Sequence, residues 1–334
     1  MRSTRATGRA MAALLECRGL NVRFRTDTGT VAAVSDLDFD LEPGECLGIV
    51  GESGSGKSQT FLAMFGLLAA NGTASGSMRF RGTELLNAPR PVLDDLRGNR
   101  LAMVFQDSLS GLTPTMRIGE QMTEILVRHQ GLGRSAARER VIQALEIVKI
   151  PDAAQRFDSY PFELSGGMRQ RVMIAMASLC KPDVLVADEC TTALDVTVQA
   201  QVLRLLDGMK RKAKTALVLI THDLGVVAGL CDRVLILYGG RAVELGPVHQ
   251  IFNAPAHPYT QALLRSVPSL VHDPREDLPV IPGQPPDLEH LPPGCSFAER
   301  CVHRLAVCET ERPPLAAVSE GHQSACHLGR GASR

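Results

Sequence analysis

One short motif constrains the fold of this chain more than any other feature: GESGSGKS at residues 51–58. It matches the pattern G-x-x-x-x-G-K-[ST]. In this pattern, glycines let successive backbone N–H groups point at phosphate oxygens, a lysine supplies a cation, and a Ser or Thr hydroxyl ligates Mg²⁺. The predicted phosphate-binding residues are Gly51, Glu52, Ser53, Gly54, Ser55, Gly56, Lys57, Ser58 and Gln59, with Ser58 also a Mg²⁺ ligand.

The residues on either side of the motif fit a strand, a loop and a helix in that order. CLGIV at 46–50 is an apolar run of buried-strand type, and Phe61, Phe65 and Leu68 recur at helical spacing. A bound phosphate would then lie at a helix N-terminus, where unpaired N–H groups and the macrodipole both favour an anion. These flanks disfavour the alternative of a chance glycine turn.

Composition excludes several classes of protein. Lys plus Arg and Asp plus Glu both number 36, so nothing indicates a basic field for nucleic acid. Aromatic residues make up 4% and Trp is absent, which argues against stacking platforms for single strands. The longest apolar run, at 62–70, is about half of the ~20 residues that span a bilayer. If a membrane is involved, we expect another chain to cross it.

Alternating polar and apolar residues predict antiparallel strands over 13–42, and helical periodicity predicts a helical insert over about 112–165. Four further runs are of buried-strand type: LAMVF at 101–105, VLVADE at 184–189, ALVLI at 216–220 and VLIL at 234–237. Buried strands separated by helices predict an α/β fold with a parallel sheet covered on both faces. Ligands of such sheets bind beyond the carboxyl ends of the strands.

Polar side chains stand at these strand ends. Asp188 is placed to hold Mg²⁺ through water, and Glu189 to polarise an attacking water. A structural strand end is the alternative, and the presence of the phosphate loop favours the catalytic interpretation. Gln106 and His222 also follow strands, although a lone strand-end histidine is more often structural.

A second anion site is predicted at LSGGM, residues 164–168, which precedes a long apolar helix. A tight helix cap is the alternative, since Ser and Gly are ordinary there. One nucleotide cannot easily be held by both helix starts of a single chain. A second copy or a homologue would have to supply one of them.

Together these motifs resemble those of the ATP-binding-cassette (ABC) ATPases over about residues 14–265. They occur in that family's order: GESGSGKS, Gln106, LSGGM, VLVADE, TTALD at 191–195 and THD at 221–223. Longer stretches, such as YPFELSGGMRQRVMIAMA and HPYTQALL, are similar in sequence to those of the ATPase subunits of oligopeptide and dipeptide importers. GLLAANG after the phosphate loop leans toward the oligopeptide type.

The resemblance implies an ABC-type P-loop NTPase fold of class α/β, with a mixed sheet core, an N-terminal antiparallel subdomain, a helical insert and a small cysteine-rich C-terminal extension. It also implies that two cassettes dock head to tail, so that ATP bound by one is capped by the signature of the other. That signature comprises Leu164, Ser165, Gly166, Gly167 and Met168.

The resemblance also implies roles for single residues. Gln106 would contact Mg²⁺ and sense the membrane partner, Asp195 would link the two sites, and His222 would contact the γ-phosphate. Phe24 lies where the family stacks an aromatic ring on adenine, although its alternation with neighbouring apolar residues fits core packing equally well. Two positions depart from the sequence pattern of the family: Cys190 stands where Pro is usual, and Phe162 stands where His is usual.

The function implied is an ATP-hydrolysing subunit that powers import of oligopeptides or dipeptides, with nickel also open as cargo. Its cofactors would be ATP and Mg²⁺, and it would lie on the cytoplasmic face of the bacterial inner membrane. Its partners would be a second ATPase subunit, identical or paralogous, two transmembrane permease subunits and an extracytoplasmic peptide-binding protein, with no nucleic acid. The alternatives are a soluble cassette protein acting on nucleic acid or ribosomes, and an iron–sulfur redox protein with an accessory nucleotide domain.

The C-terminal part has its own signal. A proline-rich linker leads to Cys295, Cys301, Cys308 and Cys326, whose thiolates suit an iron–sulfur cluster or a tetrahedral Zn²⁺. The spacing lacks the C-x₂-C pairs of common zinc sites, and the resemblance implies a [4Fe–4S] cluster; free thiols are the third alternative. The expected division is a disordered tail over 1–12, with translation starting at Met1 or Met11, an ATPase domain over 13–265 and the extension over 266–334.

Overall fold

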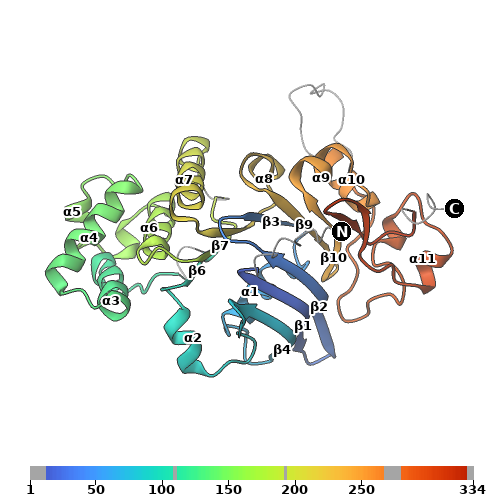
Figure 1. The fold of residues 1–334 in the computed structure, drawn as a ribbon, viewed down its shortest axis with the longest axis horizontal. Coiled ribbons are helices and arrows are strands. Elements are labelled where there is room, and N and C mark those ends of the chain that lie inside the picture. The colour runs from blue at the N-terminus through green and yellow to red at the C-terminus, as the bar shows by residue number, and fades with distance from the viewer. Residues whose placement is uncertain (1–12, 108–110, 192–193, 267–279, 329–334) are drawn as a thin grey trace, which may run out of the picture.

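The computed structural model describes residues 13–107, 111–191, 194–266 and 280–328 (Figure 1). The expected tail over 1–12 lies outside them. The strands of these residues are β1 (Leu15–Arg25), β2 (Thr30–Leu41), β3 (Cys46–Val50), β4 (Gly72–Phe80), β5 (Thr83–Glu84), β6 (Leu101–Val104), β7 (Val184–Asp188), β8 (Ala216–Ile220), β9 (Arg233–Tyr238), β10 (Arg241–Pro247), β11 (Ala316–Ser319) and β12 (His322–Ser324).

The helices are α1 (Lys57–Met64), α2 (Arg90–Leu96), α3 (Ile118–Gln130), α4 (Arg134–Ile147), α5 (Ala153–Arg156), α6 (Gly166–Ser178), α7 (Val196–Gly208), α8 (Leu224–Leu230), α9 (Val248–Asn253), α10 (Pro258–Arg265) and α11 (Val307–Thr310). Short 3₁₀ turns occur at η1 (Pro161–Glu163) and η3 (Ala298–Arg300), and a π-helical turn, η2 (Met209–Ala213), continues α7. No helix within the described ranges combines the length and apolar content that a bilayer span requires.

Two sheets form the frame, in the order β2-β1-β4-β5 and β11-β12-β10-β9-β3-β8-β7-β6. In the first sheet β1 pairs antiparallel with β2 and β4, as alternation predicts. In the second, β6, β7, β8, β3 and β9 run parallel, and β10 is antiparallel to β9. The mixed sheet core of the expected fold class is therefore confirmed.

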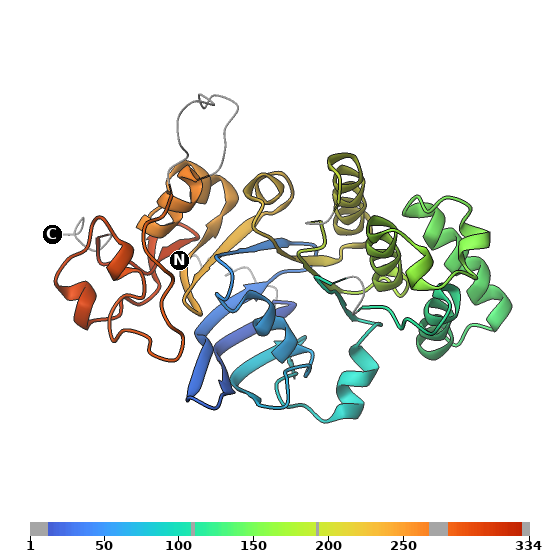
Figure 2. The ribbon, with the colours of Figure 1, turned by 180° about the vertical axis from the view of Figure 1, so that it is seen from behind.

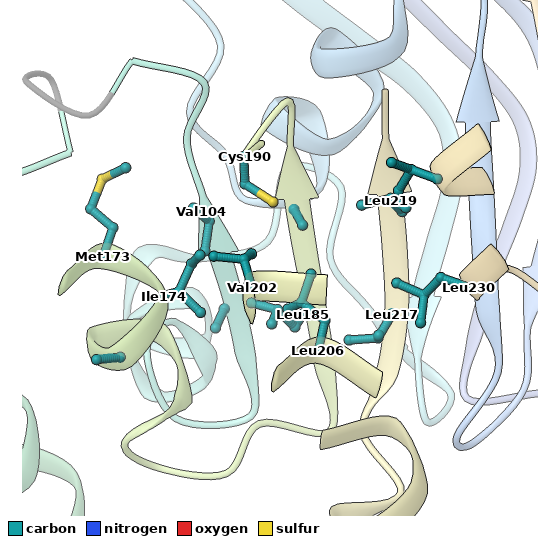
Figure 3. Close-up of a cluster of buried hydrophobic side chains, with 14 of the residues drawn as sticks. Val104, Met173, Ile174, Leu185, Cys190, Val202, Leu206, Leu217, Leu219 and Leu230 are labelled. Carbon is teal, nitrogen blue, oxygen red and sulfur yellow. The ribbon is translucent and has the colours of Figure 1, made fainter. Parts of the chain in front are cut away.

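Two apolar cores lie on the two faces of the eight-stranded sheet. Leu185 and Leu217 pack with helices α6, α7 and α8 on one face. Val186 and Val218, one residue further along the same strands, pack with the four-stranded sheet and α1 on the other. Figure 3 shows the first of these cores, with Leu206 of α7 beside the strand leucines. Burial on both faces explains why these strands read as continuous apolar runs.

The helical insert is a separate group of helices beyond β6, at one end of the molecule (Figures 1 and 2). Met122 and Leu126 of α3 meet Val141 and Leu145 of α4 in a fully buried seam. The second helix ends at Ile147, ahead of the proline that was expected to stop it. The predicted helical periodicity is thus present over this stretch.

Two features differ from the sequence expectation. Helix α1 ends at Met64, although apolar spacing extends to Leu68, because Gly66 turns the chain with a φ of 60°. The C-terminal extension also adds β11 and β12 to the large sheet, where β12 pairs antiparallel with β10. No regular element occurs over 280–294, as the proline content predicts.

Candidate active site

The phosphate loop connects the carboxyl end of β3 with the N-terminus of α1, and its glycines are required by the backbone. Gly54 and Gly56 have φ of 78° and 92°. A Cβ on Gly56 would lie 2.2 Å from the carbonyl oxygen of Ala33. A Cβ on Gly51 would lie 2.2 Å from the carbonyl oxygen of Leu237. Any other residue at 51 or 56 would displace the backbone that holds the loop.

The start of α1 leaves its donors open to a ligand. Gly56 is the N-cap and no side chain caps the helix. Lys57 is buried, and its ammonium donates to the carbonyl oxygens of Gly51 at 2.8 Å and Glu52 at 2.9 Å. A cation enclosed by a glycine loop at an uncapped helix N-terminus is suited to binding a polyphosphate.

Asp188 stands at the end of β7 and fits a divalent cation. Its side chain is buried, and Oδ1 has no hydrogen-bond partner among the described residues. Burial raises the pKa of Asp188, and a hydrogen bond with Ser58 and the charge of Lys57 oppose that rise. A buried carboxylate oxygen without a partner, beside a serine hydroxyl, is the donor set that Mg²⁺ takes in proteins. Ser58 and Asp188 would therefore hold the ion.

Glu189 lies close to the side chains of Gln106 and His222, which also follow strands. Gln106 donates through Nε2 to Glu189 Oε2 at 2.8 Å, and Nδ1 of His222 lies 3.8 Å from Glu189 Oε1. Glu189 itself has a φ of 45°, which is unusual for a residue with a side chain, and its N–H donates to Ile220 O at 2.9 Å. Strain of this kind, of order 1–3 kcal/mol, is typical of functional positions. The structure thus brings Gln106, Glu189 and His222 together.

The LSGGM stretch is used locally as a helix cap. Ser165 is the N-cap of α6, and its hydroxyl accepts a hydrogen bond from Met168 N at 3.3 Å. Helix α6 packs beside β6, whereas the phosphate loop follows β3, three strands away in the sheet order. Leu164 is buried beneath the turn, and Gly166 and Gly167 open the helix. The two anion sites of one chain are therefore separate.

Asp195, predicted to link two sites, is the N-cap of α7. Its carboxylate accepts from Val198 N at 3.0 Å. Residues 192–193 of the TTALD stretch lie outside the described ranges. Val196 directly after it is 82% exposed, and Phe162, close to LSGGM, is 69% exposed and stacks on Tyr160. Apolar side chains thus stand in solvent beside both motifs.

Phe24 and Cys190, which the sequence also singled out, both pack against apolar residues. Phe24 is half-buried against the core of the antiparallel sheet, and a Cβ on Gly72 would lie 2.7 Å from its ring. Cys190 is buried in the core shown in Figure 3, and burial raises the pKa of its thiol to about 12. The departure at 190 therefore fills an apolar site next to Glu189.

The four C-terminal cysteines lie in one region. Cys295 N donates to Cys308 O at 2.8 Å. Burial, followed by the charges of Cys308, Cys326 and Cys301, raises the pKa of Cys295 to about 11. The backbones of Cys295 and Cys308 are thus adjacent. Within the part of the chain that the structure describes, however, no group of three or more His, Cys, Asp or Glu side chains is positioned to hold a metal ion.

Two residues at the phosphate loop were missed by the sequence reasoning. Glu52 N donates to the hydroxyl of Tyr259 at 3.1 Å, and Arg300 pairs with the Glu52 carboxylate at 2.9 Å. Tyr259 belongs to the HPYTQALL stretch, so a motif in the sequence did include it. Arg300 lies in no motif.

Comparisons with known proteins agree with this geometry. The family described as "ABC transporter" matches residues 34–192, and "Oligopeptide/dipeptide transporter, C-terminal region" matches residues 243–308. The oligopeptide transport ATP-binding protein OppD of Salmonella typhimurium is 53% identical over 313 residues, which cover 94% of this chain and 93% of that protein. The proteins of the same name from Escherichia coli and Haemophilus influenzae are 52% and 51% identical, and cover 94% and 95% of this chain and 93% and 98% of their own lengths.

Solved structures share the fold. The dimeric structure of MJ0796, a bacterial ABC transporter cassette, matches with a TM-score of 0.64 at 23% identity and covers 70% of this chain and 98% of that one. The structure of cbiO1 from Clostridium perfringens, part of the ABC transporter complex cbiONQ, matches with a TM-score of 0.59 at 26% identity and covers 72% of this chain and 91% of that one.

Proposed function

Because the chain belongs to the ABC transporter family, among the oligopeptide transport ATP-binding proteins, we propose that it binds and hydrolyses ATP to power oligopeptide import across the cytoplasmic membrane. The observation that carries this function is the convergence of Gln106, Asp188, Glu189 and His222 at the strand ends beside the phosphate loop. Each group matches a need of phosphoryl transfer: charge neutralisation, an ion site and a base for the attacking water.

In this proposal the phosphate loop binds the triphosphate through its N–H groups and Lys57. Asp188, Ser58 and Gln106 would hold Mg²⁺, which would supply neutralisation of the charge on the phosphates. Glu189 accepts the proton of the attacking water, and His222 contacts the γ-phosphate. The bond between Gln106 and Glu189 keeps the base oriented before nucleotide arrives.

We assign the LSGGM helix start to the nucleotide of a second cassette. The separation of the two helix starts within one chain, beside strands that lie three places apart in the sheet, supports this assignment. The exposed Phe162 and Val196 beside the signature and Asp195 also suit a surface that a partner covers. The second cassette would be a copy or a paralogue of this chain.

The remaining parts of the proposal concern assembly and the extension. Residues 13–265 form the ATPase body and 266–334 the extension. The chain lies on the cytoplasmic face of the membrane, bound to two permease subunits that receive peptide from an extracytoplasmic binding protein. Cys295, Cys301, Cys308 and Cys326 take a [4Fe–4S] cluster in preference to Zn²⁺. The bond from Cys295 N to Cys308 O, which places two of these residues side by side, supports this part of the proposal.

The catalytic assignment is tested with Glu189→Gln. Removing a general base costs about 10²–10⁴-fold in rate, whereas the phosphate loop is untouched, so this variant should bind ATP normally and hydrolyse it at least about 100-fold more slowly. Glu146→Gln, an exposed change on α4, is the matched control and should leave both properties unchanged. Normal turnover by the Glu189 variant would refute the assignment.

The cluster assignment needs a separate measurement. Anaerobically purified chain should contain about four iron atoms and absorb near 400 nm, and a double Cys301→Ser, Cys308→Ser variant should lose both signals. Stoichiometric zinc without iron would contradict the cluster and favour the tetrahedral alternative.

A further inference from the structure

Two residues more than 200 positions further along the chain, Tyr259 and Arg300, contact the phosphate loop. Glu52, the second residue of the loop, donates its N–H to the hydroxyl of Tyr259 on α10 at 3.1 Å. Its carboxylate receives Nη1 of Arg300 at 2.9 and 3.1 Å, one distance to each oxygen. Both main chain and side chain of Glu52 are therefore fixed by the C-terminal part of the chain.

Arg300 is a rigid partner rather than a mobile surface cation. Its side chain is only 7% exposed. Besides Glu52, Nη1 donates to the hydroxyl of Tyr238 at 3.1 Å. Nε donates to Pro282 O at 2.8 Å and Nη2 to Ile281 O at 3.1 Å. Since these bonds engage all three guanidinium nitrogens, the ion pair does not lose its strength to side-chain motion as exposed pairs do.

Three aromatic rings pack together next to Arg300 and attach its segment to the rest of the chain. Phe297 contacts Tyr238 edge-on, with ring centroids 5.2 Å apart, and lies 5.4 Å from Tyr259. Tyr238 and Tyr259 are in turn 4.6 Å apart, and all three rings are buried. The extension therefore docks through the same tyrosines that contact Glu52 and Arg300. Figure 1 shows it beside β9 and β10.

The negative charge of Glu52 acts on Lys57 in the phosphate loop. Burial lowers the pKa of the Lys57 ammonium, and the carboxylates of Glu189, Asp188 and Glu52 oppose that shift. A carboxylate close enough to act on Lys57 would also repel a triphosphate held by the same lysine. The pair with Arg300 offsets this repulsion.

We propose that Arg300 is a positioning residue for ATP binding, acting through Glu52. Its guanidinium neutralises the Glu52 carboxylate and fixes the first turn of the phosphate loop in the conformation that receives the triphosphate. This inference rests on the proposed function, because it takes ATP as the ligand of the loop. It gives the extension a role in the ATPase site whether or not the cysteines bind a metal.

The test measures Mg-ATP affinity by calorimetry, and KM and kcat for ATP, on the full chain. Arg300→Gln should raise both Kd and KM about tenfold, while kcat at saturating ATP stays within about twofold. Arg300→Lys should recover part of the affinity, because it keeps the charge and loses the fork of donors.

A second substitution separates electrostatics from packing. Adding Glu52→Gln to Arg300→Gln removes the unpaired carboxylate, so the double variant should bind ATP more tightly than Arg300→Gln alone. Loss of extension docking could not be repaired in this way. Arg312→Gln is the matched control, since Arg312 joins the same extension to Asp36 at 2.6 Å through an exposed pair away from the phosphate loop. It should leave Kd unchanged.

Three results would overturn the inference. One is wild-type ATP affinity in both Arg300 variants, and another is a double variant that binds no more tightly than Arg300→Gln. The third is an equal loss of affinity in Arg312→Gln, which would trace the effect to general undocking. If the unaltered chain failed to bind Mg-ATP, the proposed function would fail first. Binding by the unaltered chain with no effect of Arg300 would remove this inference alone.

Discussion

Glu244→Gln should destabilise the fold where the extension meets the cassette, by an amount that follows from the contacts of Glu244. This carboxylate is fully buried on β10 and accepts three hydrogen bonds. They come from Ala256 N at 2.7 Å, His257 N at 3.0 Å and His322 Nε2 at 2.7 Å. A glutamine keeps one oxygen, so at least one donor faces an NH₂ group and loses its acceptor. One buried unsatisfied donor costs about 1–3 kcal/mol.

The expected loss of stability at 244 is therefore about 2 kcal/mol, which corresponds to a fall of about 3 °C in Tm for a chain of this size. Urea unfolding and thermal scans on the full chain measure it. Glu289→Gln is the matched control: Glu289 also joins the extension to the cassette, accepting from Thr26 and Thr28, but at an exposed site. It should stay within about 0.5 kcal/mol. Equal effects of the two substitutions would refute the reasoning from burial.

Two further predictions concern the same docking surface. Burial lowers the pKa of His257 to about 4 from an ordinary 6.5, so the unfolded chain takes up the proton first and stability should fall by about 3 kcal/mol as pH drops from about 6.5 to 4. His257→Asn keeps an acceptor for Tyr259 N and should flatten this part of the stability–pH curve, whereas an unchanged slope would contradict it. Phe297→Ala removes the ring contacts with Tyr238 and Tyr259 and should cost about 3 kcal/mol and accelerate proteolysis of residues 280–328; wild-type digestion would contradict that prediction.

The parts of the site that sequence predicts are those whose chemistry is local. Glycines at 51 and 56 are required by backbone contacts within and beside the loop, so their spacing alone indicates a phosphate site. Continuous apolar runs identify the buried parallel strands. Since those strands end at a common edge, the sequence alone predicts that Asp188 and Glu189 lie near the loop.

The parts that sequence does not predict depend on contacts between distant residues. β12 is three residues long, His322–Ser324, with no apolar alternation, and it becomes a strand only by pairing with β10. Arg300 and Glu52 are 248 residues apart and carry no shared pattern. The end of α1 depends on one glycine, Gly66, whose left-handed conformation outweighs the apolar spacing beyond it.

In the proposed function LSGGM of one chain completes the ATP site of another, and substitutions at Ser165 test this most directly. Asp and Asn both cap helices well, so Ser165→Asp and Ser165→Asn should leave α6 and the Tm unchanged. Only aspartate places a negative charge against the partner's triphosphate. We predict that Ser165→Asp binds ATP as the unaltered chain does yet hydrolyses it at least about 100-fold more slowly, while Ser165→Asn retains most activity. Equal turnover by the two variants would contradict the claim and reduce LSGGM to a helix cap.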